Sequence, residues 1–178
     1  MRMRKDPDYT IQKVNRRVRA AWVEGIMNDP ERAVLAVQTL RNSTMAATFL
    51  ASTAILLIMG VLTLSAGAGN LADSWSALNL LGSLHTGLLM TKLLILVVDF
   101  VVAFFAFAMA VRLFNHVGYQ INIPIGLDKP PITSHQVAIH LNRAGGFYSI
   151  GMRAYFYAVP LLFWLFGPEM LIAATRER

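Results

Sequence analysis

Long apolar blocks separated by short polar segments dominate the pattern of hydrophobic and polar positions along the chain. Three blocks are long enough to cross about 30 Å of hydrocarbon as helices, at residues 44–66, 87–114 and 150–173. A helix satisfies its own backbone hydrogen bonds where water is excluded, so a helical crossing is expected for each block. The pattern therefore predicts an all-α polytopic membrane bundle with three transmembrane helices.

The segment before the first block, residues 7–42, mixes charged and apolar positions at helical spacing. Apolar side chains recur there every four residues on one face, at Val14, Val18, Trp22 and Ile26. A helix boundary is expected near Asp29, which can cap a helix, and Pro30, which suits a first helical position. We expect an amphipathic cytoplasmic helix on the membrane surface, then a second helix that runs from near Pro30 into the first crossing.

Two connections join the three crossings. Residues 71–86 contain no Lys or Arg, which is typical of an extracytoplasmic loop or interfacial helix. Residues 115–147 contain several Pro and Gly and predict a loop, followed by a short helical stretch capped by Thr133 or Ser134. Pro160 should bend the third crossing, because it lacks an N–H and its ring clashes with the preceding turn.

The composition agrees with lipid as the solvent, since 56% of the 178 residues are hydrophobic and only 15% are charged. We expect two parts: a basic amphipathic cytoplasmic or interfacial arm over residues 1–42, and a helical membrane domain over residues 43–178. The absence of cysteine excludes disulfides, thiolate nucleophiles, cysteine-ligated zinc and iron–sulfur clusters. No cleavable signal peptide is predicted at the N-terminus.

The net charge of +6 is distributed unevenly, because nine of the sixteen Lys and Arg lie within the first 41 residues. The positive-inside rule accounts for this asymmetry better than nucleic-acid binding does, and places the N-terminus in the cytoplasm. A bacterial inner (plasma) membrane is the expected location. Arg16, Arg17 and Arg19 are expected to contact anionic lipids, with each charge near the surface contributing about 1 kcal/mol.

Four runs of residues carry a resemblance to a known family: Arg19–Val23, Ala36–Met45, Gly151–Tyr155 and Trp164–Pro168. They resemble a family of small integral membrane proteins of bacteria and plants that is described only as a domain of unknown function. The resemblance extends from about residue 6 to residue 168. It implies a helical membrane fold and no particular activity, substrate or catalytic residue. It also implies an additional apolar span at the start, which this sequence does not show.

Asp99 lies near the centre of the second crossing, where an ionised carboxylate costs several kcal/mol. It should face protein or water. Lys92, two turns earlier on a similar face, is one candidate partner, but the rise of about 10 Å between the two residues disfavours direct contact. Ser52 and Thr53, at comparable depth in the first crossing, are candidate hydrogen-bond partners. One interpretation is an ion or proton pathway. The other is a protonated or hydrogen-bonded packing residue.

Gln38, Arg41 and Asn42 precede the first crossing at spacings of three and four residues, which places them on one helix face at the cytoplasmic boundary. They predict either a lipid headgroup site or a clamp on the cytoplasmic loop. Small residues also form stripes within the crossings, at Ser43, Ala47 and Ala51 and at Ala106 and Ala110. Such stripes permit close helix approach, either inside one protomer or at a homo-oligomer seam.

The histidines, at positions 85, 116, 135 and 140, lack the spacing and acidic neighbours of a metal site. We expect no metal and no cofactor, and no nucleophile–base pair or phosphate-binding glycine loop is apparent. The leading hypothesis is a non-enzymatic membrane subunit that self-associates or joins a larger membrane complex. The alternatives are a small oligomeric ion or proton channel or transporter that uses Asp99 and, less strongly supported, a membrane enzyme that modifies lipids.

Overall fold

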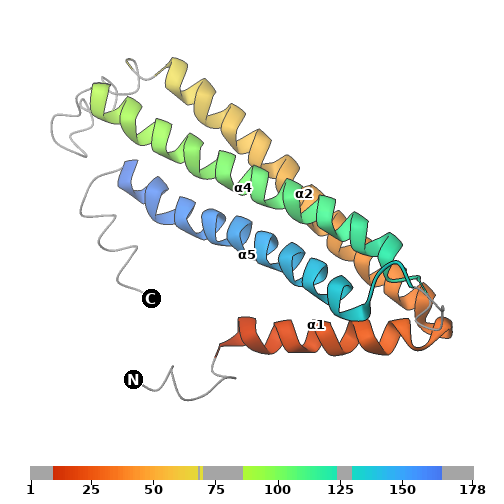
Figure 1. Ribbon diagram of the computed structural model, residues 1–178. Coiled ribbons are helices and arrows are strands. Elements are labelled where there is room, and N and C mark those ends of the chain that lie inside the picture. The colour runs from red at the N-terminus through yellow and green to blue at the C-terminus, as the bar shows by residue number, and fades with distance from the viewer. Residues whose placement is uncertain (1–9, 68, 70–85, 124–129, 166–178) are drawn as a thin grey trace, which may run out of the picture. The chain divides into compact units, whose positions relative to one another are not determined.

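The computed structural model describes residues 10–67, 69, 86–123 and 130–165. The regular structure within these residues is helical, which confirms the all-α prediction (Figure 1). The elements are α1 (Ile11–Met27), the short 3-10 helix η2 (Pro30–Arg32), α2 (Ala33–Ala66), α4 (Thr86–Gln120) and α5 (Ser134–Leu165). Contacts divide the chain into two compact units: unit 1 contains Met1–Thr48 and Ala108–Tyr148, and unit 2 contains Phe49–Phe107 and Ser149–Arg178.

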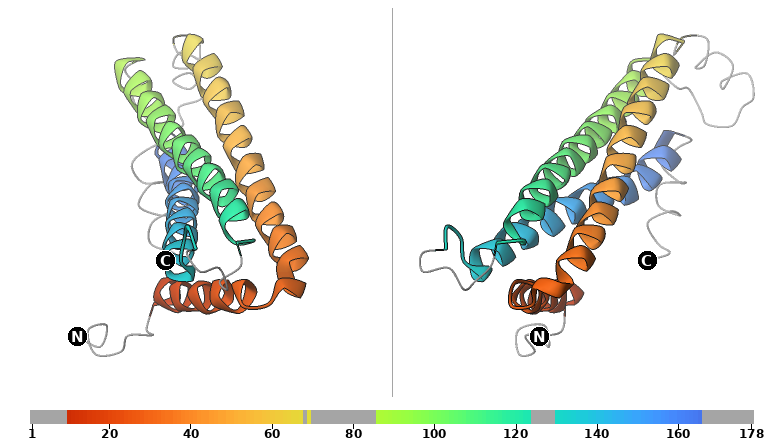
Figure 2. Two further views of the ribbon diagram at one scale, coloured as in Figure 1. Left: turned by 45° about the vertical axis from the view of Figure 1, so that its right-hand side comes forward. Right: turned by 90° about the vertical axis from the view of Figure 1, so that its right-hand side faces the viewer.

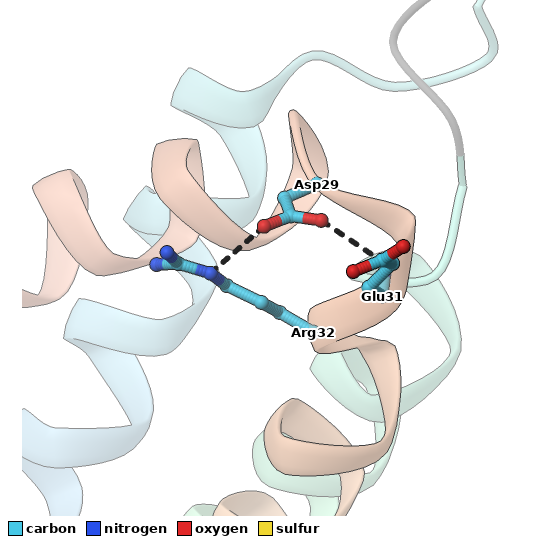
Figure 3. Close-up of polar contacts among 3 residues, drawn as sticks. All are labelled: Asp29, Glu31 and Arg32. Atoms are coloured by element: carbon cyan, nitrogen blue, oxygen red, sulfur yellow. Dashed lines mark hydrogen bonds and ion pairs between the residues drawn. The ribbon is translucent and has the colours of Figure 1, made fainter.

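The junction between α1 and α2 is the helix boundary expected around Asp29. The backbone N–H of Asn28 donates to the carbonyl of Glu24 at 3.1 Å, which closes α1. The Asp29 carboxylate accepts a hydrogen bond from the Glu31 N–H at 3.2 Å and pairs with Nε of Arg32 at 2.9 Å (Figure 3). Asp29 therefore holds η2 in place, and α1 and the start of α2 run in different directions (Figure 2).

The long helices extend further than the crossings predicted from the sequence. Helix α2 is continuous over 34 residues from Ala33, as expected, and a helix of that length measures about 50 Å. Helix α4 continues to Gln120, into the segment expected to be a loop. Helix α5 is a single element from Ser134 to Leu165, not a short stretch followed by a separate crossing, and it continues past Pro160. The connection between α4 and α5 is therefore shorter than predicted.

Thr133 and Gln136 form a reciprocal cap at the start of α5. The Gln136 N–H donates to Oγ1 of Thr133 at 3.3 Å, and the Thr133 N–H donates to Oε1 of Gln136 at 3.0 Å. This is the capping box, in which the side chain of each of two residues at a helix start accepts a hydrogen bond from the backbone N–H of the other. Of the two predicted caps, Thr133 is the one that the structure uses.

Each unit has its own apolar core. In unit 1, Val23, Ile26 and Met27 of α1 pack with buried residues of α2, α4 and α5, which include Leu40, Phe114, Val117 and Leu141. In unit 2, the buried cluster consists of Val61, Leu89, Leu93, Leu96, Phe100, Ala158 and Leu165. Only the C-terminal half of α1 is therefore anchored in a core.

Among the described residues, two helices are long and apolar enough to cross a membrane: α2, and α4 over Gly87–Gln120. The first two predicted crossings fall within them.

Candidate functional site

A polar contact in unit 1 joins the side chain of Arg19 on α1 to helix α5. Nη1 of Arg19 donates to Oδ1 of Asn142 at 3.5 Å, and Nδ2 of Asn142 donates to the backbone carbonyl of Arg16 at 3.3 Å. A Cβ atom added to Gly145 would lie 2.5–2.7 Å from the guanidinium carbon and both terminal nitrogens of Arg19. Asn142 and Gly145 thus form a fitted surface for this guanidinium, which we call the Arg19 seat.

The Arg19 guanidinium is half-buried without a counter-ion. In the part of the chain that the structure describes, Arg32 pairs with Asp29, and no carboxylate is paired with Arg19. Burial lowers the pKa of Arg19 from its ordinary value, although a guanidinium stays protonated in proteins. Its five N–H donors have one hydrogen bond, to Asn142, among these residues. The Arg19 guanidinium therefore presents a positive charge with unused N–H donors.

A pocket of about 500 Å³ adjoins the Arg19 seat. All four long helices contribute to its lining: Arg19, Trp22, Thr39, Leu40, Asn42, Ser43, Ala46, Phe114, Leu141, Gly145 and Tyr148. The hydroxyl of Thr39 donates to the Leu35 carbonyl at 2.9 Å, and that of Ser43 donates to the Thr39 carbonyl at 3.1 Å. These hydroxyl protons are already engaged, and Arg19 supplies the charged donors of the pocket.

The predicted polar cluster on α2 is split between different pockets. Asn42 lines the pocket beside Arg19, whereas Gln38 and Arg41 line a separate hollow of about 370 Å³ farther along unit 1. All three side chains are exposed. The arginines expected to act together are also separated in role, since Arg19 is half-buried and Arg16 is exposed, as is Arg17.

Asp99 lies in unit 2, and the predicted partners do not gather around it. Its Oδ2 atom is buried and, within the described residues, has no hydrogen-bond partner. Nζ of Lys92 donates to the carbonyl of Trp164 at 2.9 Å and lies 5.2 Å from the centre of that indole ring. Oγ1 of Thr53 donates to the Phe49 carbonyl in its own helix at 2.9 Å, and Ser52 is exposed.

Tyr155 connects α5 to both other helices of unit 2, a role that the sequence reasoning missed. Its hydroxyl donates to the backbone carbonyl of Leu50 on α2. Its ring packs edge-on against Phe100 and Phe107 of α4, with ring centres 6.2 and 5.4 Å apart. Gly151, one turn earlier, faces the same aromatic group: an added Cβ would lie 2.7–2.8 Å from the Phe107 ring. Gly151 and Tyr155 are the two ends of one run that carried the family resemblance.

Comparison with known proteins gives the chain a family. The family model described as "Protein of unknown function, DUF599" matches residues 1–176. The chain belongs to this family. The resemblance inferred from the four short runs is therefore confirmed. No curated protein and no solved structure matches the chain.

The stripes of small residues in this DUF599 member are largely covered by the chain itself. Ala47, Ala51, Ala106 and Ala110 are buried. Ser43 is half-buried and lines the pocket beside Arg19. Substituting these alanines would thus disturb contacts within the protomer.

The described histidines of the DUF599 chain do not converge on a common point. Nδ1 of His140 lies 2.9 Å from Oε1 of Gln120, which links α5 to the end of α4. His116 and His135 are exposed, and His85 lies outside the described residues. Over those residues, no group of three or more His, Asp, Glu or Cys side chains is placed to hold a metal ion.

Proposed function

We propose that this DUF599 protein is an integral membrane protein with three helical crossings, by α2, α4 and α5, that acts as a self-associating or complex-forming membrane subunit. The exposure of large apolar side chains carries the proposal. On α2, Phe49 is 72% and Leu56 is 71% exposed; on α4, Leu94 is 63% and Phe105 is 62% exposed. Apolar surface on this scale is unfavourable in water by about 25 cal/mol per Å² and needs lipid or a partner to cover it.

The third crossing, by α5, is supported by the same property. Phe156 is 55% exposed, Val159 47% and Phe163 45%. These side chains lie within the last turns of α5 that the structure describes, and the apolar sequence continues to residue 173. Three crossings place the two termini on opposite sides of the membrane.

The distribution of charge supports a cytoplasmic position for unit 1, and with it the N-terminus. The Lys and Arg residues of unit 1 within the described part are Lys13, Arg16, Arg17, Arg19, Arg32, Arg41, Arg112 and Arg143, whereas unit 2 has Lys92 and Arg153. The positive-inside rule assigns the part of the chain that is richer in Lys and Arg to the cytoplasm, and a bacterial inner membrane suits this assignment. Helix α1, with Ile11, Val14 and Val18 exposed among basic residues, suits an anionic lipid surface.

Cysteine labelling tests the three crossings, because the natural chain has no cysteine and provides a clean background. We expect Ser74→Cys and Thr175→Cys to react with a membrane-impermeant maleimide in intact cells. Asn122→Cys should react only after the cells are permeabilised. The unsubstituted chain is the control for non-specific labelling. Protection of Thr175→Cys, with Ser74→Cys still reactive, would reduce the crossings to two; recovery of the chain without membranes or detergent would overturn the proposal.

Self-association is tested by the mass of the detergent-solubilised protein. We expect particles that contain more than one copy, or one copy with a co-purifying membrane partner. The reason is that other residues of the same chain leave a large part of the apolar surface of α2 and α4 uncovered. Light scattering corrected for bound detergent, or native mass spectrometry, gives this mass. A strict monomer without a partner, at every concentration and in several mild detergents, would eliminate the subunit role while leaving the membrane crossings intact.

A second candidate function, an ion or proton pathway, is favoured by one observation: the buried Oδ2 of Asp99 within an apolar helix. Carboxyl groups at membrane depth are expensive and are characteristic of ion and proton routes. The expected signature is ion or proton flux through reconstituted liposomes that is lost in Asp99→Asn. Traces at the level of empty liposomes for both proteins would remove this candidate.

A further inference from the structure

We propose that the pocket beside the Arg19 seat is a binding site for a phosphate oxyanion joined to an apolar chain. The phosphate of an anionic phospholipid headgroup fits this description, and a soluble phosphate compound shares the chemistry of the charged part. The lipid as source rests on the proposed membrane location, whereas the oxyanion site rests on unit 1 alone.

The charge of the pocket calls for an anion. Arg19 brings a half-buried guanidinium whose counter-ion is missing within the described residues, and the pocket lining contains no Asp or Glu. A charged group out of water is stable only when it is paired and hydrogen-bonded. A phosphate fits a guanidinium especially well, because two parallel N–H donors can engage two of its oxygens.

The guanidinium is held ready for such a ligand. Asn142 accepts from one terminal nitrogen, and the missing side chain of Gly145 lets the guanidinium lie directly on the backbone of α5. A fixed orientation reduces the entropy lost when a ligand binds. The exposed amide of Asn42, on the opposite helix, provides a second donor at the pocket.

The rest of the pocket suits an apolar chain. Leu40, Phe114 and Leu141 line it with Trp22, whose indole combines an apolar body with an N–H donor. The volume of about 500 Å³ is within the usual range of small-molecule pockets, and it exceeds what a phosphate group alone would fill. The pocket therefore matches an amphiphile better than a free inorganic ion.

This site differs from the general attraction of a basic helix to an anionic surface. Exposed arginines such as Arg16 act through screened, additive electrostatics, so their contributions are similar and fall with salt. A pocket built on the single guanidinium of Arg19 should instead bind one ligand at saturation, and its affinity should depend on Arg19 far more than on Arg16. Comparing these two residues separates the explanations.

The test uses the full chain in a non-ionic detergent, titrated with phosphatidylglycerol, with diacylglycerol of the same acyl chains, and with inorganic phosphate. Native mass spectrometry at two salt concentrations measures occupancy. We expect one saturable phosphatidylglycerol molecule, bound at least about tenfold more weakly by Arg19→Gln, a change of about 1.4 kcal/mol. Arg16→Gln is the matched control and should change the affinity less than twofold. Saturable competition by inorganic phosphate would support the oxyanion site with a soluble phosphate as its source.

Because Arg19 also joins α1 to α5, a second variant guards against loss of folding. Ala46→Phe should fill the pocket from α2, where Ala46 is exposed, and should weaken lipid binding while leaving Arg19 in its seat. Equal binding of phosphatidylglycerol and diacylglycerol, or equal losses in Arg16→Gln and Arg19→Gln, would overturn the proposal. Either result would leave the membrane crossings untouched, since those are read by cysteine labelling.

Discussion

Gly151→Ala should destabilise the protein, whereas Gly146→Ala, five residues earlier in the same helix, should stabilise it slightly. An added Cβ at Gly151 would lie 2.7–2.8 Å from the ring of Phe107, which is fully buried, so the ring or the helix would have to shift. Overpacking of this kind costs about 1–3 kcal/mol. At Gly146 nothing lies within 4 Å of an added Cβ, so alanine should contribute its better helix propensity, up to about 1 kcal/mol.

Thermal unfolding in one mild detergent measures the pair, since both variants change the same residue type in α5. Phe107→Leu supplies the second arm, because shortening the ring should relieve the clash. We expect Gly151→Ala to cost less in the Phe107→Leu background than in the natural one, which is the coupling expected of residues in contact. If both glycine variants melted above the natural protein, the close approach of α5 to Phe107 would be wrong.

The helical class and the positions of two helix starts were predictable because they follow from local patterns. Apolar blocks of sufficient length indicated the cores of α2 and α4, and Asp29 and Thr133 marked the helix starts through capping chemistry that involves only neighbouring residues. The lengths of α4 and α5 were not predictable in the same way. Polar residues beyond the apolar block, such as His140, stay helical because unit 1 packs around them, as in the contact of His140 with Gln120.

The candidate site was predictable only as a concentration of charge. Arg16, Arg17 and Arg19 look equivalent in sequence, and the difference arises from Asn142 and Gly145, more than 120 residues away from Arg19. Likewise, helix spacing offers Lys92 as a candidate partner of Asp99, but Lys92 contacts Trp164, a residue on another helix. Spacing along one helix indicates which residues share a face. It does not indicate which residues of other helices meet that face.

The run Gly151–Tyr155 is a second case in which the sequence of one helix does not identify its contacts on other helices. Its residue types carried the family resemblance, and a spacing of four places both ends on one helix face. Nothing in the sequence identified Phe107 as the group that this face receives, or the Leu50 carbonyl as the acceptor of the Tyr155 hydroxyl. The packing role of the run becomes apparent only when α4 and α2 are placed beside it.

Asp99→Leu should raise the stability of the protein, which is the second large effect expected. The buried Oδ2 of Asp99 has no hydrogen-bond partner in the described part of the chain. Leaving a buried polar group unsatisfied costs about 1–3 kcal/mol, and an apolar side chain of similar size removes that cost. We therefore expect a stabilisation of about 2 kcal/mol, measured by thermal or chemical unfolding in detergent, with Val98→Leu, at an exposed neighbouring position, as the near-neutral control.

The sign of the Asp99→Leu result distinguishes a packing residue from a functional one. A clear loss of stability would mean that the carboxyl group has a stabilising partner, and the unsatisfied state of Oδ2 would be wrong. A gain would mean that the natural protein retains an acid that weakens its fold, which is the usual mark of a group kept for function. If Asp99→Leu stabilised the protein and abolished ion or proton flux, the natural Asp99 would be a residue that lowers stability in exchange for transport. If it stabilised the protein and neither protein showed flux, the remaining function for Asp99 would be the assembly of unit 2 with other membrane chains.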